Sequence, residues 1–207
     1  ANMMRVQEDK DRLIAYYRSL GYFNARVDYQ TKYYDSGEFL DVSFIIDEKQ
    51  RFSVRNVSVV GNKFFSSDLL LAELDLNPGD YFNLAKMNRD QRKLRNEFYG
   101  REGFVFVDII AEPRFLEEPG QLDLVFRVNE GDRYRAGEIN VHIAGDSSHT
   151  QHNVVVNLLG IRPGEIIDLQ ELENSERRLR FSQIFETNPT IGEPPRVEVR
   201  PPDQPDF

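Results

Sequence analysis

The sequence of 207 residues contains no cysteine, which excludes disulfide bonds, thiolate catalysis and cysteine-ligated zinc. No apolar run approaches the ~20 residues that a transmembrane helix requires, and no signal peptide is visible at the start. The glycine-rich nucleotide loops, the H-E-x-x-H zinc motif and the G-x-S-x-G nucleophile motif are all missing. We therefore expect a protein that is not an enzyme, with no catalytic residue, cofactor or metal ion.

Basic residues are too few for a typical nucleic-acid-binding protein. The chain has 26 Lys and Arg against 35 Asp and Glu, a formal net charge of −9 and a pI near 5.0. Phosphate neutralisation supplies most of the affinity for nucleic acids, so we expect no nucleic-acid partner. Anionic lipid surfaces are disfavoured for the same reason. The hydrophobic share of 40% and the aromatic share of 12% are nevertheless sufficient for packed cores.

What the sequence does contain is an internal repeat. One self-alignment places Gly21 on Gly103, and a second, with a slightly larger offset, places the turn at 78–79 on the one at 163–164. The first alignment also places Leu40, Val42, Phe44, Ile46 and Glu48 on Leu122, Leu124, Phe126, Val128 and Glu130. Arrays of one module usually present extended surfaces rather than a single active site. The repeat therefore favours a scaffold.

The middle unit contains a complete set of elements. Ser66 is placed to cap a short helix that ends near Leu74. A longer amphipathic helix is expected from near Asn83, and Gly103 ends it as a C-terminal left-handed residue. Alternating apolar residues predict strands at 54–59, 104–112 and 122–128. The order is β-α-α-β-β, which predicts an α+β fold with two helices packed on a three-stranded mixed sheet.

The division predicted from the repeat is a first unit at 1–50, a second at 51–131 and a third at 132–207. The first unit shows only the C-terminal half of the pattern: a helix ending at Gly21, then strands at 23–33 and 39–48. The third shows the front, with a strand at 138–144 and helices at 153–159 and 169–182. Its last strand is expected beyond Phe207. We interpret the chain as an excised piece of a longer protein.

This unit resembles the polypeptide-transport-associated (POTRA) domain. The resemblance covers nearly the whole chain and rests on Val57-Ser-Val-Val-Gly-Asn62, Pro78-Gly79, Tyr99 to Phe104, and the closing run that ends at Glu130-Gly131. POTRA arrays occur in the periplasmic part of outer-membrane barrel assembly proteins and of related secretion and organelle-import pores. The resemblance implies a periplasmic scaffold, tethered to the outer membrane by a C-terminal barrel absent from this chain.

The resemblance also implies a mechanism, which is strand addition. In POTRA domains the strand after the second helix lies at the sheet edge, where unpaired N–H and C=O groups can accept an extended chain. The implied partners are unfolded outer-membrane protein segments, assembly lipoproteins and other periplasmic proteins. The candidate partner-binding residues are Phe23, Ala25, Val27, Tyr29, Phe104, Val105, Phe106, Val107, Asp108, Ile109 and Ile110.

Other interpretations compete with these predictions. The side chains of Phe104, Phe106 and Val107 suit core packing better than peptide anchoring, so the edge backbone is the favoured site. The spacing of His149 and His152 suits a metal, but no acidic or cysteine ligand accompanies them. Two other functions stay open. One is a POTRA-bearing secretion or division protein, and the other is a ferredoxin-like nucleic-acid-binding module, which the acidic balance opposes.

Overall fold

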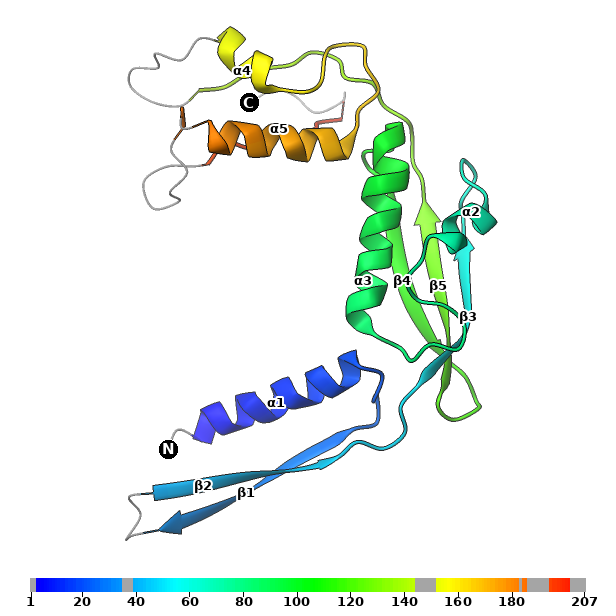
Figure 1. Ribbon diagram of the computed structural model, residues 1–207, viewed down its shortest axis with the longest axis vertical. Helices are drawn as coiled ribbons and strands as arrows, with labels where there is room; N and C mark the ends of the chain where they lie inside the picture. The colour runs from blue at the N-terminus through cyan, green and yellow to red at the C-terminus, as the bar shows by residue number, and fades with distance from the viewer. Residues whose placement is uncertain (1–2, 35–38, 144–151, 183, 186–193, 202–207) are drawn as a thin grey trace. The chain divides into compact units, whose positions relative to one another are not determined.

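The structure is a computed structural model that describes residues 3–34, 39–143, 152–182, 184–185 and 194–201 (Figure 1). The chain forms two compact units, residues 1–91 with 109–128 and residues 92–108 with 129–207. In the described residues, no helix is both long and apolar enough to cross a membrane.

The first compact unit begins with a helix and a two-stranded sheet. Helix α1 spans Met3–Ser19, strand β1 spans Arg26–Tyr34 and strand β2 spans Phe39–Asp47. β1 and β2 pair in antiparallel register, with Arg26 opposite Asp47. This is the predicted C-terminal half of a repeat. Gly21 follows the helix with φ +97°, as its position predicts.

The middle repeat has the predicted order of elements. Strand β3 spans Ser53–Val60, helix α2 Ser67–Ala72, helix α3 Leu84–Lys93, strand β4 Asp108–Phe115 and strand β5 Gln121–Asn129. The α-helical hydrogen bonding of α3 gives way to a π-helical segment at Leu94–Tyr99 and a 3₁₀ turn at Gly100–Glu102. The β-α-α-β-β prediction is therefore confirmed.

The sheet of the middle repeat has the order β3-β5-β4, with β3 and β5 parallel. β5 lies at the centre, and its residues Leu122, Leu124 and Phe126 are fully buried. Helix α2 contacts β3, and the side chain of Gln91 in α3 donates to the carbonyl of Ile109 in β4. Figure 1 shows α3 (green) lying along β4. The helices therefore cover a mixed sheet, as predicted.

Local side chains explain where the two helices begin. The hydroxyl of Ser66 accepts a hydrogen bond from the Leu69 amide, so Ser66 is the N-cap of α2, as predicted. The Asn83 side chain accepts one from the Lys86 amide at 3.0 Å and caps α3 in the same way. The side chains of Leu74 and Leu94 are buried, whereas Phe98 is half-buried.

The third repeat contains helices α4, His152–Leu158, and α5, Leu169–Phe181. Both were predicted within one residue of their observed ends. The strand predicted at 138–144 is wrong for residues 138–143, which form no strand, and Ala144 lies outside the described residues. A strand needs a hydrogen-bonded neighbour, and the described part of this repeat offers only an isolated bridge between Arg135 and Ile166.

Candidate partner-binding edge strands

Strand β4 lies at the edge of the three-stranded sheet, as the strand after the helix pair was predicted to do. Its sheet neighbour is β5, and no other described strand lies on its outer side. Pro113 falls inside β4. Because proline has no backbone N–H to donate, it is tolerated in strands mainly at edges, with its nitrogen facing away from the ladder. The sequence of β4 is therefore consistent with its place in the sheet.

Three observations show which backbone groups of β4 face outward. Pro113 can give no hydrogen bond to β5, the Ile109 carbonyl accepts from Gln91, and the Leu116 amide donates to the carbonyl of Gln121 in β5. In an antiparallel strand, the N–H and C=O of one residue face the same side and alternate along the chain. The odd-numbered residues of β4 therefore face the open edge, and the even-numbered residues face β5.

This alternation separates the candidate residues in β4. By this alternation, Asp108 and Ile110 direct their backbone groups toward β5, whereas Ile109 directs its groups away from β5, where Gln91 already donates to its carbonyl. The outward N–H of Ala111, which the sequence did not single out, lies between Ile109 and Pro113. Sequence periodicity could not identify it, because periodicity places side chains on faces and does not say which neighbour receives the backbone groups.

Phe104 to Val107 are not part of the edge strand, so the prediction of a strand from residue 104 was wrong. Gly103 has φ +88° and ends the helical segment, after which the Phe104 amide donates to the Tyr99 carbonyl. The Val107 amide then donates to the Phe104 carbonyl and closes a turn. The side chains of Phe104, Val105 and Val107 are buried, whereas Phe106 is 42% exposed.

The second candidate edge, β1, starts later than predicted. Val27 and Tyr29 lie in the strand, but Phe23 and Ala25 precede it. Phe23 instead belongs to an aromatic cluster, with ring centroids 5.4 Å from Phe52, 5.0 Å from Phe82 and 4.8 Å from Phe115. Its packing explains why the strand cannot extend back to it. β1 pairs only with β2 among the described strands, so its other edge is open.

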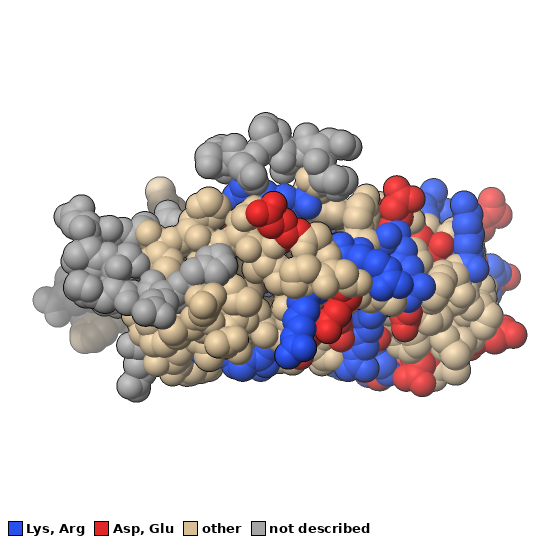
Figure 2. Space-filling view, turned by 90° about the horizontal axis from the view of Figure 1, so that it is seen from above, with Lys and Arg blue, Asp and Glu red and all other residues tan. Residues whose placement is uncertain are grey.

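The charges beside the β4 edge are largely paired. The Arg127 guanidinium lies 2.8 Å from the Glu112 carboxylate, and Arg114 lies 3.6 Å from it. The hydrogen bond from Arg127 holds the pKa of Glu112 below its usual range. Figure 2, which shows another view of the molecule without marking its strands, has blue and red residues interspersed on its right side. Main-chain hydrogen bonding, rather than a field of one sign, is therefore what the β4 edge can offer.

Two hydrogen bonds connect residues 51–52, at the entry to the middle repeat, with residues 20–21, which follow α1. We call this contact the joint. The Phe52 amide donates to the Gly21 carbonyl at 2.8 Å, and the Arg51 Nε donates to the Leu20 carbonyl at 2.8 Å. The Arg51 guanidinium also lies over the ring of Tyr81, 4.4 Å from its centroid. The chain that enters the middle repeat is thus held against the end of the preceding helix.

The same joint occurs again at the equivalent positions of the next repeat. The Tyr134 amide donates to the Gly103 carbonyl at 2.8 Å, and the Arg133 Nε donates to the Glu102 carbonyl. The sequence analysis missed both joint arginines, Arg51 and Arg133. The self-alignment that places Gly21 on Gly103 also places Arg51 on Arg133, and this was the signal that could have identified them.

Metal binding finds no support in the described residues, where no group of three or more His, Asp or Glu side chains is placed to hold an ion. The residue pair weighed as a metal motif is only partly described. His149 lies outside the described residues, and His152 is seen only as the first residue of α4.

Comparison with known proteins agrees with the fold and the repeat. The sequence profile of the POTRA family, described as "Surface antigen variable number repeat", matches residues 2–49 and 52–131. The outer membrane protein assembly factor BamA of Nitratidesulfovibrio vulgaris is 29% identical over 126 residues, covering 60% of this chain and 15% of that protein. BamA of Neorickettsia risticii is 25% identical over 211 residues, covering 97% of this chain and 27% of that protein.

This chain thus spans less than a third of the length of either relative. The crystal structure of Haemophilus influenzae BamA POTRA3-5 superposes with a TM-score of 0.66 at 18% identity. The match covers 88% of this chain and 71% of that one, so the two share a fold. The matched ranges of the family profile include more than half of the sequence, and the β-α-α-β-β order between Ser53 and Asn129 is present. The chain therefore belongs to the POTRA family.

Proposed function

We propose that this chain is a periplasmic scaffold of an outer-membrane protein assembly factor, and that it is not an enzyme. It receives extended segments of unfolded outer-membrane proteins by strand addition to the open edges of β4 and β1. Assembly lipoproteins or other periplasmic proteins are its further partners, and a membrane barrel elsewhere in the full protein tethers it. Family membership and the relatives named as assembly factors support this role. The division into POTRA-like units at 1–50, 51–131 and 132–207 is part of the same proposal.

The position of β4 at the edge of the sheet, with β5 on one side and no described strand on the other, is the observation that supports the mechanism. Main-chain hydrogen bonds are nearly independent of the partner's side chains, which suits a receptor for many different sequences. Each bond contributes only about 0.5–1.5 kcal/mol net, and Pro113 removes one donor from the edge. Binding at one edge is therefore weak and reversible, and edges in series raise the overall affinity through effective concentration.

Strand addition is tested by one substitution that introduces a proline at the β4 edge and by another that removes one. Ala111→Pro removes an outward N–H and is expected to weaken binding of an extended alternating peptide by about 2- to 10-fold, the equivalent of one hydrogen bond. Pro113→Ala restores an outward N–H and is expected to strengthen binding by a similar factor. Affinities come from peptide titrations followed by the backbone amide signals of β4 in NMR spectra.

The matched controls separate binding from folding. Ala111→Gly keeps the donor and should bind like the native chain, whereas Ile110→Pro removes an N–H that faces β5 and should mainly lower the stability of the sheet. If Ala111→Pro and Pro113→Ala both left the affinity unchanged while the perturbed amides clustered on helices, strand addition would be the wrong mechanism.

A further inference from the structure

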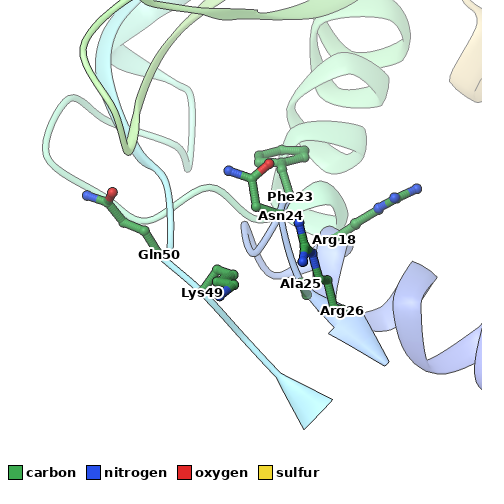
Figure 3. Close-up of a pocket in the computed structure, with 7 residues that line it drawn as sticks. All are labelled: Arg18, Phe23, Asn24, Ala25, Arg26, Lys49 and Gln50. Atoms are coloured by element: carbon green, nitrogen blue, oxygen red, sulfur yellow. The ribbon is translucent and has the colours of Figure 1, made fainter. Parts of the chain in front are cut away.

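A pocket of 570 Å³ in the first compact unit has an unusual lining. It lies where the β1–β2 ladder ends and is lined by Arg18, Phe23, Asn24, Ala25, Arg26, Lys49 and Gln50 (Figure 3). Arg18 comes from α1, Arg26 begins β1, and Lys49 follows β2. All its charged side chains are cationic and its other polar ones are amides, although acidic residues outnumber basic ones in the chain.

Nearby carboxylates do not cancel this charge in the described part of the unit. Asp47, opposite Arg26 in the ladder, lies 2.6 Å from the Lys49 ammonium, and Lys49 and Arg26 together hold the pKa of Asp47 low. Glu48 is engaged by the Tyr17 hydroxyl. Glu48 keeps its negative charge when it accepts this hydrogen bond, so three cationic side chains face two carboxylates, Asp47 and Glu48. The pocket therefore keeps a smaller surplus of positive charge, and Arg18 forms no ion pair with another described residue.

The middle repeat shows that the fold does not require these cationic side chains. In the self-alignment that places Gly21 on Gly103, the positions of Arg18, Arg26, Lys49 and Gln50 are occupied by Gly100, Asp108, Gly131 and Asp132. If a residue type were needed for the fold, we would expect it at the equivalent position of both repeats, as glycine occurs at both 21 and 103. The first repeat therefore has a basic lining that the middle repeat lacks.

Lys49 strengthens this argument. It has φ +58°, in the region where its counterpart Gly131 has φ +64°. A residue with a Cβ pays about 1 kcal/mol or more in that region, whereas glycine does not. The first repeat thus carries a cation where a glycine would be less strained. Backbone strain of this kind is expected where a side chain has a role beyond folding.

We infer that this pocket binds a carboxylate at the C-terminal end of an extended partner segment paired with β1. The inference rests on the proposed strand addition, here at the β1 edge. Antiparallel pairing is the slightly more stable arrangement. Because β1 runs from Arg26 to Tyr34, an antiparallel partner ends its pairing beside Arg26. Guanidinium groups bind carboxylates through charge-assisted, often bidentate hydrogen bonds.

The carboxylate can come from an acidic side chain or from the end of the partner chain. One alternating apolar peptide distinguishes them in four forms: free C-terminus, C-terminal amide, amide with a final Glu, and amide with a final Gln. The receptor is the native chain, the double variant Arg18→Gln with Arg26→Gln, or the control Arg5→Gln with Arg12→Gln. The control removes the same charge from exposed positions of α1.

The native chain is expected to bind one or both carboxylate peptides about 1.5- to fivefold more tightly than their amide counterparts, as for exposed ion pairs. This preference should weaken with added salt. It should also disappear in the Arg18/Arg26 variant and persist in the Arg5/Arg12 control. Equal affinities for acid and amide peptides, with the β1 amides still perturbed, would overturn the pocket inference while leaving strand addition intact.

A titration with succinate alone separates the two proposals. If no peptide binds, strand addition to β1 fails, and the pocket is then judged by the amide signals of Asn24, Arg26, Lys49 and Gln50. Succinate is expected to shift these signals in the native chain but not in the Arg18/Arg26 variant. A carboxylate site would be excluded if succinate produced no shift of these signals. It would also be excluded if inorganic phosphate shifted them and succinate did not.

Discussion

Gly103→Val is expected to lower the free energy of unfolding by about 2–5 kcal/mol. The left-handed backbone at φ +88° costs a residue with a Cβ about 1–2 kcal/mol, and forcing extra atoms into a packed site costs about 1–3 kcal/mol. A Cβ at this position would lie 2.7 Å from the Tyr134 carbonyl oxygen and 3.1 Å from the Ile166 side chain. The Tyr134 carbonyl is backbone and is fixed by the joint, so it cannot move aside cheaply.

Substitutions of two other glycines in the same compact unit separate the cost of the left-handed backbone from the cost of the close contacts. Gly131 has φ +64° but nothing within 4 Å of a built Cβ, so Gly131→Val should show the backbone cost alone. Gly137 has neither a positive φ nor a close neighbour, and Gly137→Val should change stability little. Chemical denaturation followed by circular dichroism gives the three values. If Gly103→Val cost no more than Gly137→Val, Gly103 would be an ordinary loop residue.

The sequence could predict the conformation of Gly103 but not its environment. A glycine directly after a predicted helix indicates a left-handed residue, and both Gly21 and Gly103 have a positive φ. The contact with Tyr134 depends on how the next repeat is entered, which no local pattern encodes. Sequence reasoning therefore underestimates the cost of substitution wherever two repeats meet.

The strand predicted from Phe104 failed for a related reason. Val105, Val107 and Ile109 alternate with Phe106 and Asp108, and this period of two is the pattern of a strand. The structure buries all three side chains, but residues 104–107 form a turn and only Ile109 lies in β4. Alternation indicates which side chains are buried. It does not indicate whether the backbone has a hydrogen-bonded neighbour, and this is what defines an edge strand.

Asp90→Ala is the second substitution with a large expected effect, a loss of about 2–6 kcal/mol. Asp90 is 1% exposed, and its carboxylate accepts hydrogen bonds from the Asp75 amide at 2.8 Å and the Leu76 amide at 3.0 Å. Removing the acceptor leaves two amides without their partner, and each unsatisfied buried group costs about 1–3 kcal/mol. Hydrogen exchange at the Asp75 and Leu76 amides should accelerate together with the loss of stability.

The third repeat provides a weaker version of the same contact for comparison. Ser175 is the counterpart of Asp90 in the self-alignment that places the turn at 78–79 on the one at 163–164. It is fully buried, and its hydroxyl accepts a hydrogen bond from the Gly160 amide at 2.8 Å. The hydroxyl also accepts from the Arg178 guanidinium at 2.9 Å and donates to the Glu171 carbonyl at 2.8 Å. Arg178 keeps its bonds to the Leu158 carbonyl and the Glu171 carboxylate in the absence of the hydroxyl. Ser175→Ala therefore leaves one buried amide without its acceptor where Asp90→Ala leaves two, and should cost about half as much, on the order of 1–3 kcal/mol. If Asp90→Ala cost no more than Ser175→Ala, the two bonds at Asp90 would not be responsible for its effect.

The stability that Asp90 contributes is expected to change with pH in a definite direction. Burial raises the pKa of its carboxyl above the ordinary value, and this outweighs the two amide hydrogen bonds, which lower it. A carboxyl whose pKa is raised by folding contributes stability that is fully present below its unfolded pKa of about 4 and is lost as pH rises through the folded pKa. The stability difference between the native chain and Asp90→Asn is therefore expected to shift in favour of the native chain as pH falls from 7.

Comparing these two proteins isolates Asp90 from the other carboxylates. Glu112, Asp123 and Glu171 have lowered pKa values because arginines donate hydrogen bonds to them, so both proteins lose stability in acid for this shared reason. That loss cancels in the difference measured by urea denaturation at each pH. A difference that moved in favour of Asp90→Asn toward acid would mean that the two amide bonds stabilise the carboxylate more than burial penalises it, and that Asp90 is charged throughout.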